Sequence, residues 1–292
     1  MRVLITGCNG QVGYFLTERL KNKADILALD RKELDITDQK AVIKTVYDEF
    51  KPDYIINAAA HTAVDRAEEE VELSNAINRD GPQYLAEAAQ QANAVMLHIS
   101  TDYVFDGEGE KPYLETDLTA PQGVYGKSKL GGELAVAQSC AKHLILRTAW
   151  VFGEHGNNFV KTMLRLAQKH DELSIVGDQF GGPTYAGDIA DALVAMVEYI
   201  EQGQKPVWGT YHFSGMPYAS WYDFASKIFQ LAEGKGVLNK KPKLSSIPTS
   251  AYPTPAKRPA NSRLDCRNIE NQFGIKPSDW IAALENIQAY TS

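Results

Sequence analysis

The first thirty residues of this chain follow the order strand, glycine turn, helix, strand and acid. Arg2–Thr6 is a short apolar run rich in Val, Leu and Ile, a composition that favours a buried parallel strand. Gly7, Gly10 and Gly13 follow it, and a helix-compatible pattern then runs to about Lys21. Because this order is far more specific than a group of glycines alone, it constrains the fold more than any other stretch.

These glycines suit a turn that binds a dinucleotide. Gly7 permits a tight exit from the strand, and Gly10 permits the backbone to approach a pyrophosphate. Gly13 permits close packing of helix and sheet, so that the N-terminus of the helix points at the anion. A second apolar run, Ile26–Leu29, ends in Asp30, where a carboxylate can accept a hydrogen bond from a ribose 2′-hydroxyl. The opening therefore predicts a dinucleotide cofactor.

Strands and helices alternate through the first half of the chain. The further strands are expected at Asp53–Ala60, Ala94–Ser100 and His143–Val151, and the further helices at Ala41–Tyr47, at Val64–Ala92 with an interruption near Pro82, and at Tyr125–Ala141. With right-handed crossovers, this alternation predicts an α/β fold, a Rossmann-type doubly wound parallel sheet, for residues 1–152 as the dinucleotide-binding domain.

The pattern changes beyond residue 152. Helices are expected at Asn158–Lys169, Asp188–Ile200 and Ser220–Glu233, a strand at Val207–Phe213, and an extended proline-rich connection at Pro242–Pro259. We expect residues 153–292 to form mainly a smaller C-terminal substrate-binding lobe, with some segments that return to the sheet.

The composition excludes several classes of protein. A chain of 292 residues with 44% hydrophobic and 23% charged residues can bury a sizeable core. A net charge of −7 argues against a nucleic-acid partner, because phosphate binding requires a basic surface. No apolar run approaches a membrane span, and a strand that starts at residue 2 leaves no room for a signal peptide. Three widely spaced cysteines indicate neither disulfides nor zinc, so we expect a cytoplasmic protein.

A tyrosine and a lysine four residues apart share one face of a helix. The chain has this spacing at Tyr125 and Lys129 and again at Tyr47 and Lys51. Ligands of a doubly wound sheet bind at the carboxyl ends of the strands, where the following helices begin. Tyr125 lies at such a helix start, whereas the other pair ends the helix that leads into the third strand. We therefore interpret Tyr125 and Lys129 as the catalytic pair and the other two as a solvated helix face.

Tyr125 is expected to donate a proton to the substrate. A phenol is a poor acid at neutral pH, with a reference pKa of about 10. The ammonium of Lys129 is expected to lower the pKa of Tyr125 and so ease proton donation to a developing alkoxide. Thr101, at the end of the fourth strand, can hydrogen-bond the substrate carbonyl. On its own this threonine would equally suit backbone capping, but beside Tyr125 and the glycine turn the catalytic interpretation is favoured.

Several stretches together match the pattern of a known family. They are Gly7–Gly13, Asn57–Asp65, Ser100–Phe105, Tyr125–Lys129, Arg147–Trp150, Gly156–Phe159 and Arg258–Pro259. At these residues the chain resembles the extended short-chain dehydrogenase/reductase superfamily and, within it, the dTDP-4-dehydrorhamnose reductase family. The resemblance implies NAD(P)H-dependent reduction of the C4 keto group of dTDP-4-dehydro-6-deoxy-L-mannose (dTDP-4-dehydro-L-rhamnose) to dTDP-L-rhamnose. It also implies a role in cell-surface polysaccharide biosynthesis, such as that of lipopolysaccharide O-antigen.

The resemblance also implies which residues bind each ligand. The cofactor-binding residues would be Gly7, Gly10, Gln11, Val12, Gly13, Asp30, Arg31, Asp35, Ile36, Ala60, His61 and Thr62, together with Tyr125 and Lys129. The substrate-binding residues would be Thr101, Asp102, Trp150, Asn158 and Arg258. Trp150 would be an apolar wall for the deoxysugar ring. Arg258 is expected to contact the diphosphate, because a guanidinium suits bidentate oxygens.

Both NADPH and NADH are expected as cofactors. Asp30 should repel a 2′-phosphate, whereas Arg31 and Lys32 can attract one. Some relatives dimerise around Mg²⁺ held by acidic side chains, but Phe15 and Gly187 stand in the corresponding regions of this chain. We therefore expect no metal, and a monomer or a weak homodimer.

Other functions on the same fold remain open. A nucleotide-sugar 4,6-dehydratase needs a further acid after the Thr-Asp pair, and Tyr103 at that position disfavours it. A nucleotide-sugar 4-epimerase uses the same tyrosine and lysine, and another keto-sugar reductase would use the same site. A non-catalytic NAD(P)-binding regulatory subunit is a further alternative, against which the intact set of Tyr125, Lys129 and Thr101 weighs.

Overall fold

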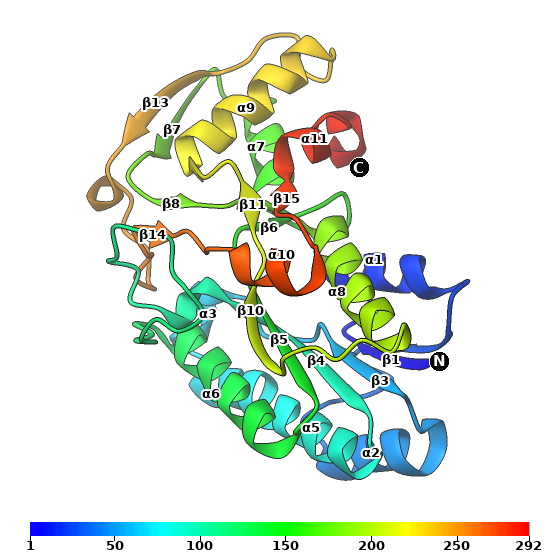
Figure 1. The fold of residues 1–292 in the computed structure, drawn as a ribbon. Coiled ribbons are helices and arrows are strands. Elements are labelled where there is room, and N and C mark those ends of the chain that lie inside the picture. Colours follow the sequence, from blue (N-terminus) through cyan, green and yellow to red (C-terminus); the bar gives the residue numbers. More distant parts are fainter. Residues whose placement is uncertain (292) are drawn as a thin grey trace.

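A sheet of six parallel strands forms the centre of the molecule (Figure 1). The computed structural model describes residues 1–291. In space the strands follow the order β10-β5-β4-β3-β1-β2, and neighbours run parallel throughout. Their bounds are β1 Arg2–Thr6, β2 Asp25–Leu29, β3 Tyr54–Asn57, β4 Val95–Thr101, β5 His143–Thr148 and β10 Gly209–His212. The predicted α/β fold with a Rossmann-type parallel sheet is confirmed.

The strand order reverses at β1, which pairs with β2 on one side and with β3 on the other. Such a switch point opens a crevice at the carboxyl ends of the strands. The ends that flank it are Thr6, Leu29 and Asn57. Thr101 at the end of β4 is in register with Thr148 of β5. The predicted catalytic threonine therefore lies at the same edge of the sheet as the glycine turn.

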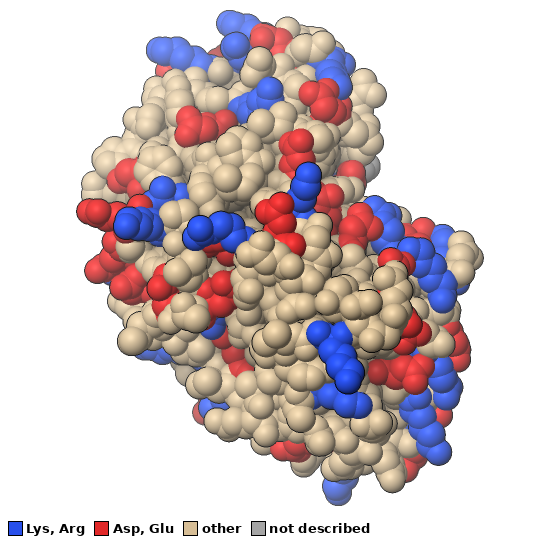
Figure 2. Space-filling view, viewed as in Figure 1, with Lys and Arg blue, Asp and Glu red and all other residues tan. Residues whose placement is uncertain are grey.

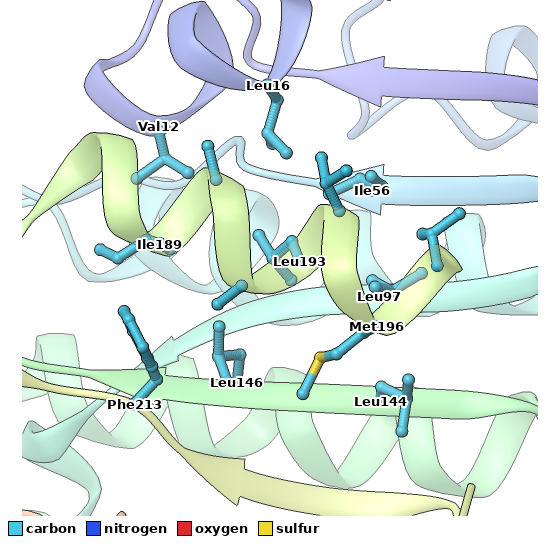
Figure 3. Close-up of a cluster of buried hydrophobic side chains, with 14 of the residues drawn as sticks. Val12, Leu16, Ile56, Leu97, Leu144, Leu146, Ile189, Leu193, Met196 and Phe213 are labelled. Atoms are coloured by element: carbon cyan, nitrogen blue, oxygen red, sulfur yellow. The ribbon is translucent and has the colours of Figure 1, made fainter. Parts of the chain in front are cut away.

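Helices cover both faces of the sheet. On one face lie α1 Gln11–Leu20 and α8 Ala186–Glu201, and on the other lie α2 Gln39–Ile43 with its π-helical continuation η1 Lys44–Phe50, α5 Gly81–Gln91 and α6 Val124–Ser139. Figure 3 shows apolar side chains of α1 and α8 meeting those of β3, β4 and β5. Successive residues of β1 alternate between the two cores, because Val3 and Ile5 enter this one and Leu4 enters the opposite one.

Three predicted segments differ from the observed ones, and one of them is the strand expected over His143–Val151, which ends at Thr148. The long helix expected over Val64–Ala92 is divided into four pieces: α3 Val64–Ala67, α4 Val71–Asn75, the π-helix η2 Ala76–Asp80, and α5. Pro82 stands in the first turn of α5, and the π-helix η2 runs directly into that turn without a gap. The third strand ends at Asn57 rather than Ala60. The chain leaves the sheet there because Ala59 N donates to the Asn57 side chain at 3.0 Å.

The second half of the chain builds a separate core from short elements. Its elements are β6 Val151–Phe152, α7 Phe159–Ala167, β7 Glu172–Val176, β8 Phe180–Gly181, β9 Thr184–Tyr185, β11 Gly215–Met216, β12 Ala219–Ser220, α9 Trp221–Gly234, β13 Lys243–Ile247, β14 Asn261–Ser262, α10 Arg267–Phe273, β15 Ser278–Asp279 and α11 Trp280–Leu284. Single-turn 3₁₀ segments are η3 Asp102–Val104, η4 Thr249–Ala251 and η5 Ile287–Thr291. Apolar side chains of α7, α9 and α11 pack together in this core.

Later segments also lie against the first half of the chain. β10 joins the large sheet beside β5, and α8 packs along α1. The stretch expected as an extended proline-rich connection contains β13, which pairs in parallel with β7. The division of the chain at residue 152 stays a prediction.

The face of the molecule shown in Figure 2 mixes positive and negative side chains without a broad basic area. This distribution accords with the acidic net charge of −7. Among residues 1–291, the structure contains no helix with the length and apolar character needed to cross a membrane.

A buried ion pair fastens α6 to the sheet. Arg147 Nη2 of β5 lies 2.6 Å from Glu133 Oε2 of α6, and their side chains are only 6% and 4% exposed. Arg147 Nε and the Ser100 hydroxyl both donate to Glu133 Oε1, at 2.9 and 2.5 Å. Such a pair is tolerated in a core because its charges are paired and hydrogen-bonded. Since Glu133 follows Lys129 by one helical turn, the pair also fixes that part of α6.

Breaking the pair on one side should destabilise the protein strongly. We expect Arg147→Met to lower the free energy of unfolding by about 3–5 kcal/mol, because Glu133 would stay buried without its partner. Arg147→Met combined with Glu133→Leu should recover most of this loss, because neither charge then stays buried. Urea unfolding followed by circular dichroism measures both changes.

The exposed pair between Lys243 and Glu172 provides a matched control. Both side chains are 72% exposed at a separation of 3.2 Å. Lys243→Met should leave the unfolding midpoint nearly unchanged, because solvent screens such a pair. An Arg147→Met variant as stable as this control would contradict the structural role given to the buried pair.

Candidate active site

The glycine turn packs backbone directly on backbone. Gly7 follows β1 with a φ of +72°, a left-handed conformation that glycine adopts without strain. A Cβ on Gly13 would lie 2.1 Å from the Gly7 carbonyl oxygen, and one on Gly7 would lie 2.7 Å from the Ala59 backbone. Only glycines therefore let α1 begin this close to the sheet. Gly10 is the N-cap of α1, and it has no side chain that could cap the first N–H groups of the helix. These N–H groups are therefore free to bind an anion.

Asp30 stands beside this turn at the end of β2. Its Oδ2 accepts a hydrogen bond from Asn9 Nδ2 at 2.8 Å. Its Oδ1 accepts from the backbone N–H groups of Lys32 and Glu33, at 2.7 and 3.2 Å. The carboxylate is thus fixed next to the phosphate-binding turn, where an adenosine ribose would lie. Arg31 is exposed directly after it.

A cavity of about 300 Å³ adjoins the turn and has mostly apolar walls. Its lining residues are Gly7, Gly10, Arg31, Leu34, Asp35, Ile36, Ala58, Ala59, Ala60, His61 and Ile77. The structure brings seven residues predicted from the sequence together there, and it adds Leu34, Ala58, Ala59 and Ile77. Ala58 and Ala59 follow β3 directly, and small residues at the carboxyl end of a strand are the sequence signal that could have identified them as lining residues. The cradle of glycines and this cavity fit the pyrophosphate and the adenine of a dinucleotide.

His61 is held by its neighbours and not poised for acid–base chemistry. Its Nδ1 lies 2.9 Å from Ser74 Oγ, and its Nε2 lies 3.1 Å from Glu70 Oε2. The buried Asn78 side chain accepts from His61 N at 2.8 Å and donates to His61 O at 3.0 Å. Asn78 Nδ2 also donates to Ser128 of α6 at 3.1 Å. Asn78 therefore joins the cavity wall to the catalytic helix, a role that sequence reasoning missed.

The remaining predicted cofactor residues lie around the start of α1 and next to His61. Val12 is buried in the core beneath α1, and Thr62 is exposed. The Asn158 amide donates to Gly153 O at 2.6 Å and to Gln11 Oε1 at 3.1 Å. Its oxygen caps α7. Asn158 thus links the second half of the chain to the glycine turn, and its predicted contact with substrate stays a prediction.

Tyr125, Lys129 and Thr101 lie together at the edge of the sheet. Tyr125 and Lys129 occupy the first two turns of α6, and Thr101 ends β4. All three are buried, with exposed fractions of 9%, 2% and 5%. The Thr101 hydroxyl hydrogen-bonds the Tyr125 phenol. Lys129 Nζ donates to the Ile99 carbonyl at 2.7 Å, which holds the ammonium between helix and strand.

Burial governs the protonation of this group. It raises the pKa of Tyr125, and the hydrogen bond from Thr101 opposes that shift. It lowers the pKa of Lys129 to about 8, and the charge of Glu133 opposes that shift. The expectation that Lys129 lowers the pKa of Tyr125 is therefore wrong for this structure, since desolvation of the phenol is the largest effect. Tyr125 keeps its proton at neutral pH.

Asp102 and Tyr103 continue the catalytic edge. Thr101 Oγ1 donates to Asp102 Oδ1 at 3.1 Å, and burial raises the pKa of the Asp102 carboxyl to about 6. The Tyr103 ring meets the Tyr125 ring edge-on, with centroids 5.4 Å apart. Burial raises the pKa of Tyr103 to about 12. These neighbours enclose Tyr125 and explain its desolvation.

Arg258 forms an ion pair with Asp65. Its Nη2 lies 2.6 Å from Asp65 Oδ2, and Ala256 N donates to Asp65 Oδ1 at 3.1 Å. Arg258 also lies close enough to the Tyr103 phenol to oppose the rise in its pKa that burial causes. The loop after β13 is thereby tied to the segment after β3, beside the catalytic edge. Arg258 is close to the site, and its contact with a diphosphate stays a prediction.

Trp150 lies two residues beyond the end of β5, the strand that pairs with the strand of Thr101. Its ring is partly exposed and packs between the apolar cluster around Phe105 and the core of the second half. This placement brings a large apolar surface to the sheet edge that holds Thr101 and Tyr125. Its predicted contact with the sugar stays a prediction.

No cluster of three or more His, Cys, Asp or Glu side chains suited to a metal ion occurs within residues 1–291. The cysteines Cys8, Cys140 and Cys266 are unpaired thiols. The expectation of an enzyme without a metal stays a prediction.

A protein-family model described as "RmlD substrate binding domain" matches residues 1–291. The dTDP-4-dehydrorhamnose reductase of Aggregatibacter actinomycetemcomitans is 53% identical over 291 residues, which cover 99% of each chain. The enzyme of the same name from Escherichia coli K12 is 44% identical over 96% of this chain and 94% of its own.

Solved structures agree with this relationship. A dTDP-4-dehydrorhamnose reductase from Clostridium acetobutylicum is 42% identical, with a TM-score of 0.91 and 98% of both chains covered. One from Bacillus anthracis, in complex with NADP, is 40% identical, with a TM-score of 0.88 over 98% of this chain and 97% of its own. A UDP-glucose 4-epimerase from Thermus thermophilus in complex with NAD, only 21% identical with a TM-score of 0.80 over 100% and 99% of the chains, shares the fold. The chain belongs to the dTDP-4-dehydrorhamnose reductase family.

Proposed function

We propose that this chain is an NAD(P)H-dependent reductase that converts the C4 keto group of dTDP-4-dehydro-L-rhamnose into the hydroxyl group of dTDP-L-rhamnose. The observation that carries the proposal is the grouping of Tyr125, Thr101 and Lys129 at the sheet edge that also holds the dinucleotide turn. Membership of the reductase family supports the same reaction.

The cofactor would be held by the residues already described. The first turn of α1 would bind the pyrophosphate, Asp30 would accept from the ribose, and the cavity beside Ile36 would take the adenine. Lys129 would hydrogen-bond the nicotinamide ribose. When bound, the reduced nicotinamide supplies the hydride.

Tyr125 would supply the proton. Its raised pKa keeps the phenol protonated at neutral pH, and an alkoxide is the stronger base and takes that proton. The Thr101 hydroxyl, which donates to Asp102 Oδ1 in this structure, would turn to donate to the same oxygen as negative charge develops on it.

Turnover with defined substrates tests the function. NADPH absorbance should fall in proportion to added dTDP-linked 4-keto-6-deoxy sugar, and much less with a UDP-linked one. A flat trace with every keto sugar would leave the regulatory-subunit alternative in place. Enzyme that is purified with tightly bound NAD and releases no oxidised cofactor would instead indicate a 4-epimerase.

The proposal extends to where and in what form the enzyme works. We propose a cytoplasmic monomer or weak homodimer. Three unpaired thiols suit a reducing compartment, and residues 1–291 hold no candidate membrane helix. Light scattering over a concentration series should show mainly the 32.3 kDa monomer mass, and a stable higher oligomer would contradict the proposal.

The two Tyr-x-x-x-Lys pairs allow a matched test of the proton donor. We expect Tyr125→Phe to lower kcat by about 10²–10⁴-fold, because general acid catalysis contributes that much. NADPH affinity should stay near that of the wild type, as measured by cofactor fluorescence. Tyr47→Phe, at a tyrosine that is 48% exposed, should leave both values unchanged. A Tyr125→Phe variant that keeps most of its rate would refute the assignment.

The pH profile reports on Lys129. A lysine whose pKa is lowered to about 8 carries its charge below that pH and loses it as the pH rises through that value. We therefore expect kcat/KM to fall about tenfold per pH unit above about pH 8, because the ammonium that would hydrogen-bond the nicotinamide ribose is lost. Lys129→Met should be slow and should lack this alkaline limb. A wild-type profile that stays flat to pH 9.5 would rule out this role for Lys129.

Cofactor preference tests Asp30. Asp30→Asn removes the charge but keeps an acceptor for the backbone N–H groups of Lys32 and Glu33. We expect the kcat/KM ratio of NADPH to NADH to rise about tenfold, the effect of roughly 1.4 kcal/mol of relieved repulsion. Arg31→Ala should shift the same ratio toward NADH. Unchanged ratios in both variants would show that neither side chain senses the 2′-position.

A further inference from the structure

Two indole rings stack at the boundary between the catalytic edge and the second core. The rings of Trp150 and Trp221 have centroids 3.5 Å apart and planes within 10° of parallel. Trp150 follows β5, and Trp221 is the first residue of α9. The stack therefore connects the strand next to Thr101 with a helix of the second half.

The Trp150 backbone has a φ of +48°, in the left-handed region that bulky residues rarely adopt. Such conformations persist where the surroundings impose them, and they are common at ligand sites. Gly181 of β8 packs against the same indole, since a Cβ there would lie 2.6 Å from Trp150 Cε2. Trp150 is thus confined by the Gly181 backbone and by the Trp221 ring.

Trp221 is itself held firmly. The Ser220 hydroxyl accepts from Asp223 N at 3.0 Å, and Asp223 Oδ2 accepts from Ser220 N at 3.0 Å, so a capping box fixes the start of α9. The Phe159 ring of α7 packs on the Trp221 ring with centroids 4.6 Å apart. The second core therefore provides a rigid support on which the Trp150 indole rests.

We propose that Trp221 is a positioning residue for sugar recognition, because it holds the Trp150 indole in the orientation that packs against the apolar C–H face and methyl group of a 6-deoxyhexose. The inference rests on the proposed function, in which the Trp150 side chain contacts the deoxysugar ring of the substrate. The part of the indole that stays exposed between Trp221 and Gly181 provides a rigid apolar surface for such a ring. Trp221 acts through Trp150 and touches no reacting atom.

Kinetics of Trp221→Ala test the inference. We expect the KM for the dTDP-linked keto sugar to rise about threefold to tenfold, the worth of one aromatic contact. A contact made equally in ground and transition states affects KM and leaves kcat unchanged. The KM for NADPH should also stay unchanged. Trp221→Phe should keep the KM for the sugar close to that of the wild type, because a ring still supports Trp150.

Circular dichroism gives a readout that is independent of activity. A stacked indole pair produces an exciton couplet, which should be present in the wild type and in Trp208→Phe. Trp208 precedes β10 at the opposite end of the sheet and serves as the matched control. The couplet should disappear in Trp221→Phe and should persist when dTDP-L-rhamnose binds. Its loss on binding would show that the rings separate and would overturn the inference.

The remaining outcomes separate the two proposals. If the wild type does not oxidise NADPH with the keto sugar, the proposed function fails. If the wild type turns over and Trp221→Ala keeps the KM for the sugar, only the present inference fails. Equal changes in kcat and in both KM values would indicate general damage to the fold and would also overturn it. Should Trp221→Ala not fold, Trp221→Leu replaces it in the same assay.

Discussion

The contact between the start of α1 and the exit from β1 determines where everything else can lie. With no side chain at Gly13 or Gly7, the helix reaches the strand end and the Ala59 backbone reaches the turn. A residue from the second half of the chain, His155, also packs against this turn. The His155 ring stacks on Tyr14 with centroids 4.3 Å apart, and its Nε2 lies 3.1 Å from Asn9 O. A larger residue in the turn would displace the helix, the cavity and the second half together.

Desolvation shapes the chemistry at the neighbouring strand end. It disfavours both the phenolate of Tyr125 and the ammonium of Lys129, so the charged forms exist only with help from fixed partners. Ile99 provides a carbonyl for the lysine, and Glu133 provides a negative charge one turn further along α6. The same carboxylate neutralises Arg147. One buried acid, Glu133, therefore both anchors α6 and opposes the loss of charge at Lys129.

Sequence reasoning succeeded where the signal is local. The strand, the turn, the helix and Asp30 are contiguous, and the helical spacing of Tyr125 and Lys129 needs no tertiary information. It failed where partners are distant in the chain. Nothing in the local pattern pairs β13 with β7 or brings Arg258 to Asp65. The long expected helix is interrupted at residues 68–70, and it becomes π-helical in η2 directly before the turn that holds Pro82.

The pKa of Tyr125 was mispredicted for a related reason. The spacing of two side chains on one helix gives their proximity, but it does not give the burial that Tyr103 and the neighbouring strand impose. The desolvation of a titratable group depends on the side chains that bury it, and these side chains come from elements that are distant in the sequence. Proximity could be predicted from the sequence, and the electrostatic environment could not.

A fold of this kind carries many reactions, so the dinucleotide half cannot by itself specify the substrate. In this chain the additional groups at the sheet edge that holds Tyr125 come from later segments. Arg258 lies close to Tyr103 from the loop after β13, and the Trp221 ring of α9 stacks on Trp150. Each of these contacts joins a residue of the second half to a residue beside the sheet. Under the proposed function, sugar specificity can vary through these long-range contacts while the chemistry at Tyr125 stays constant.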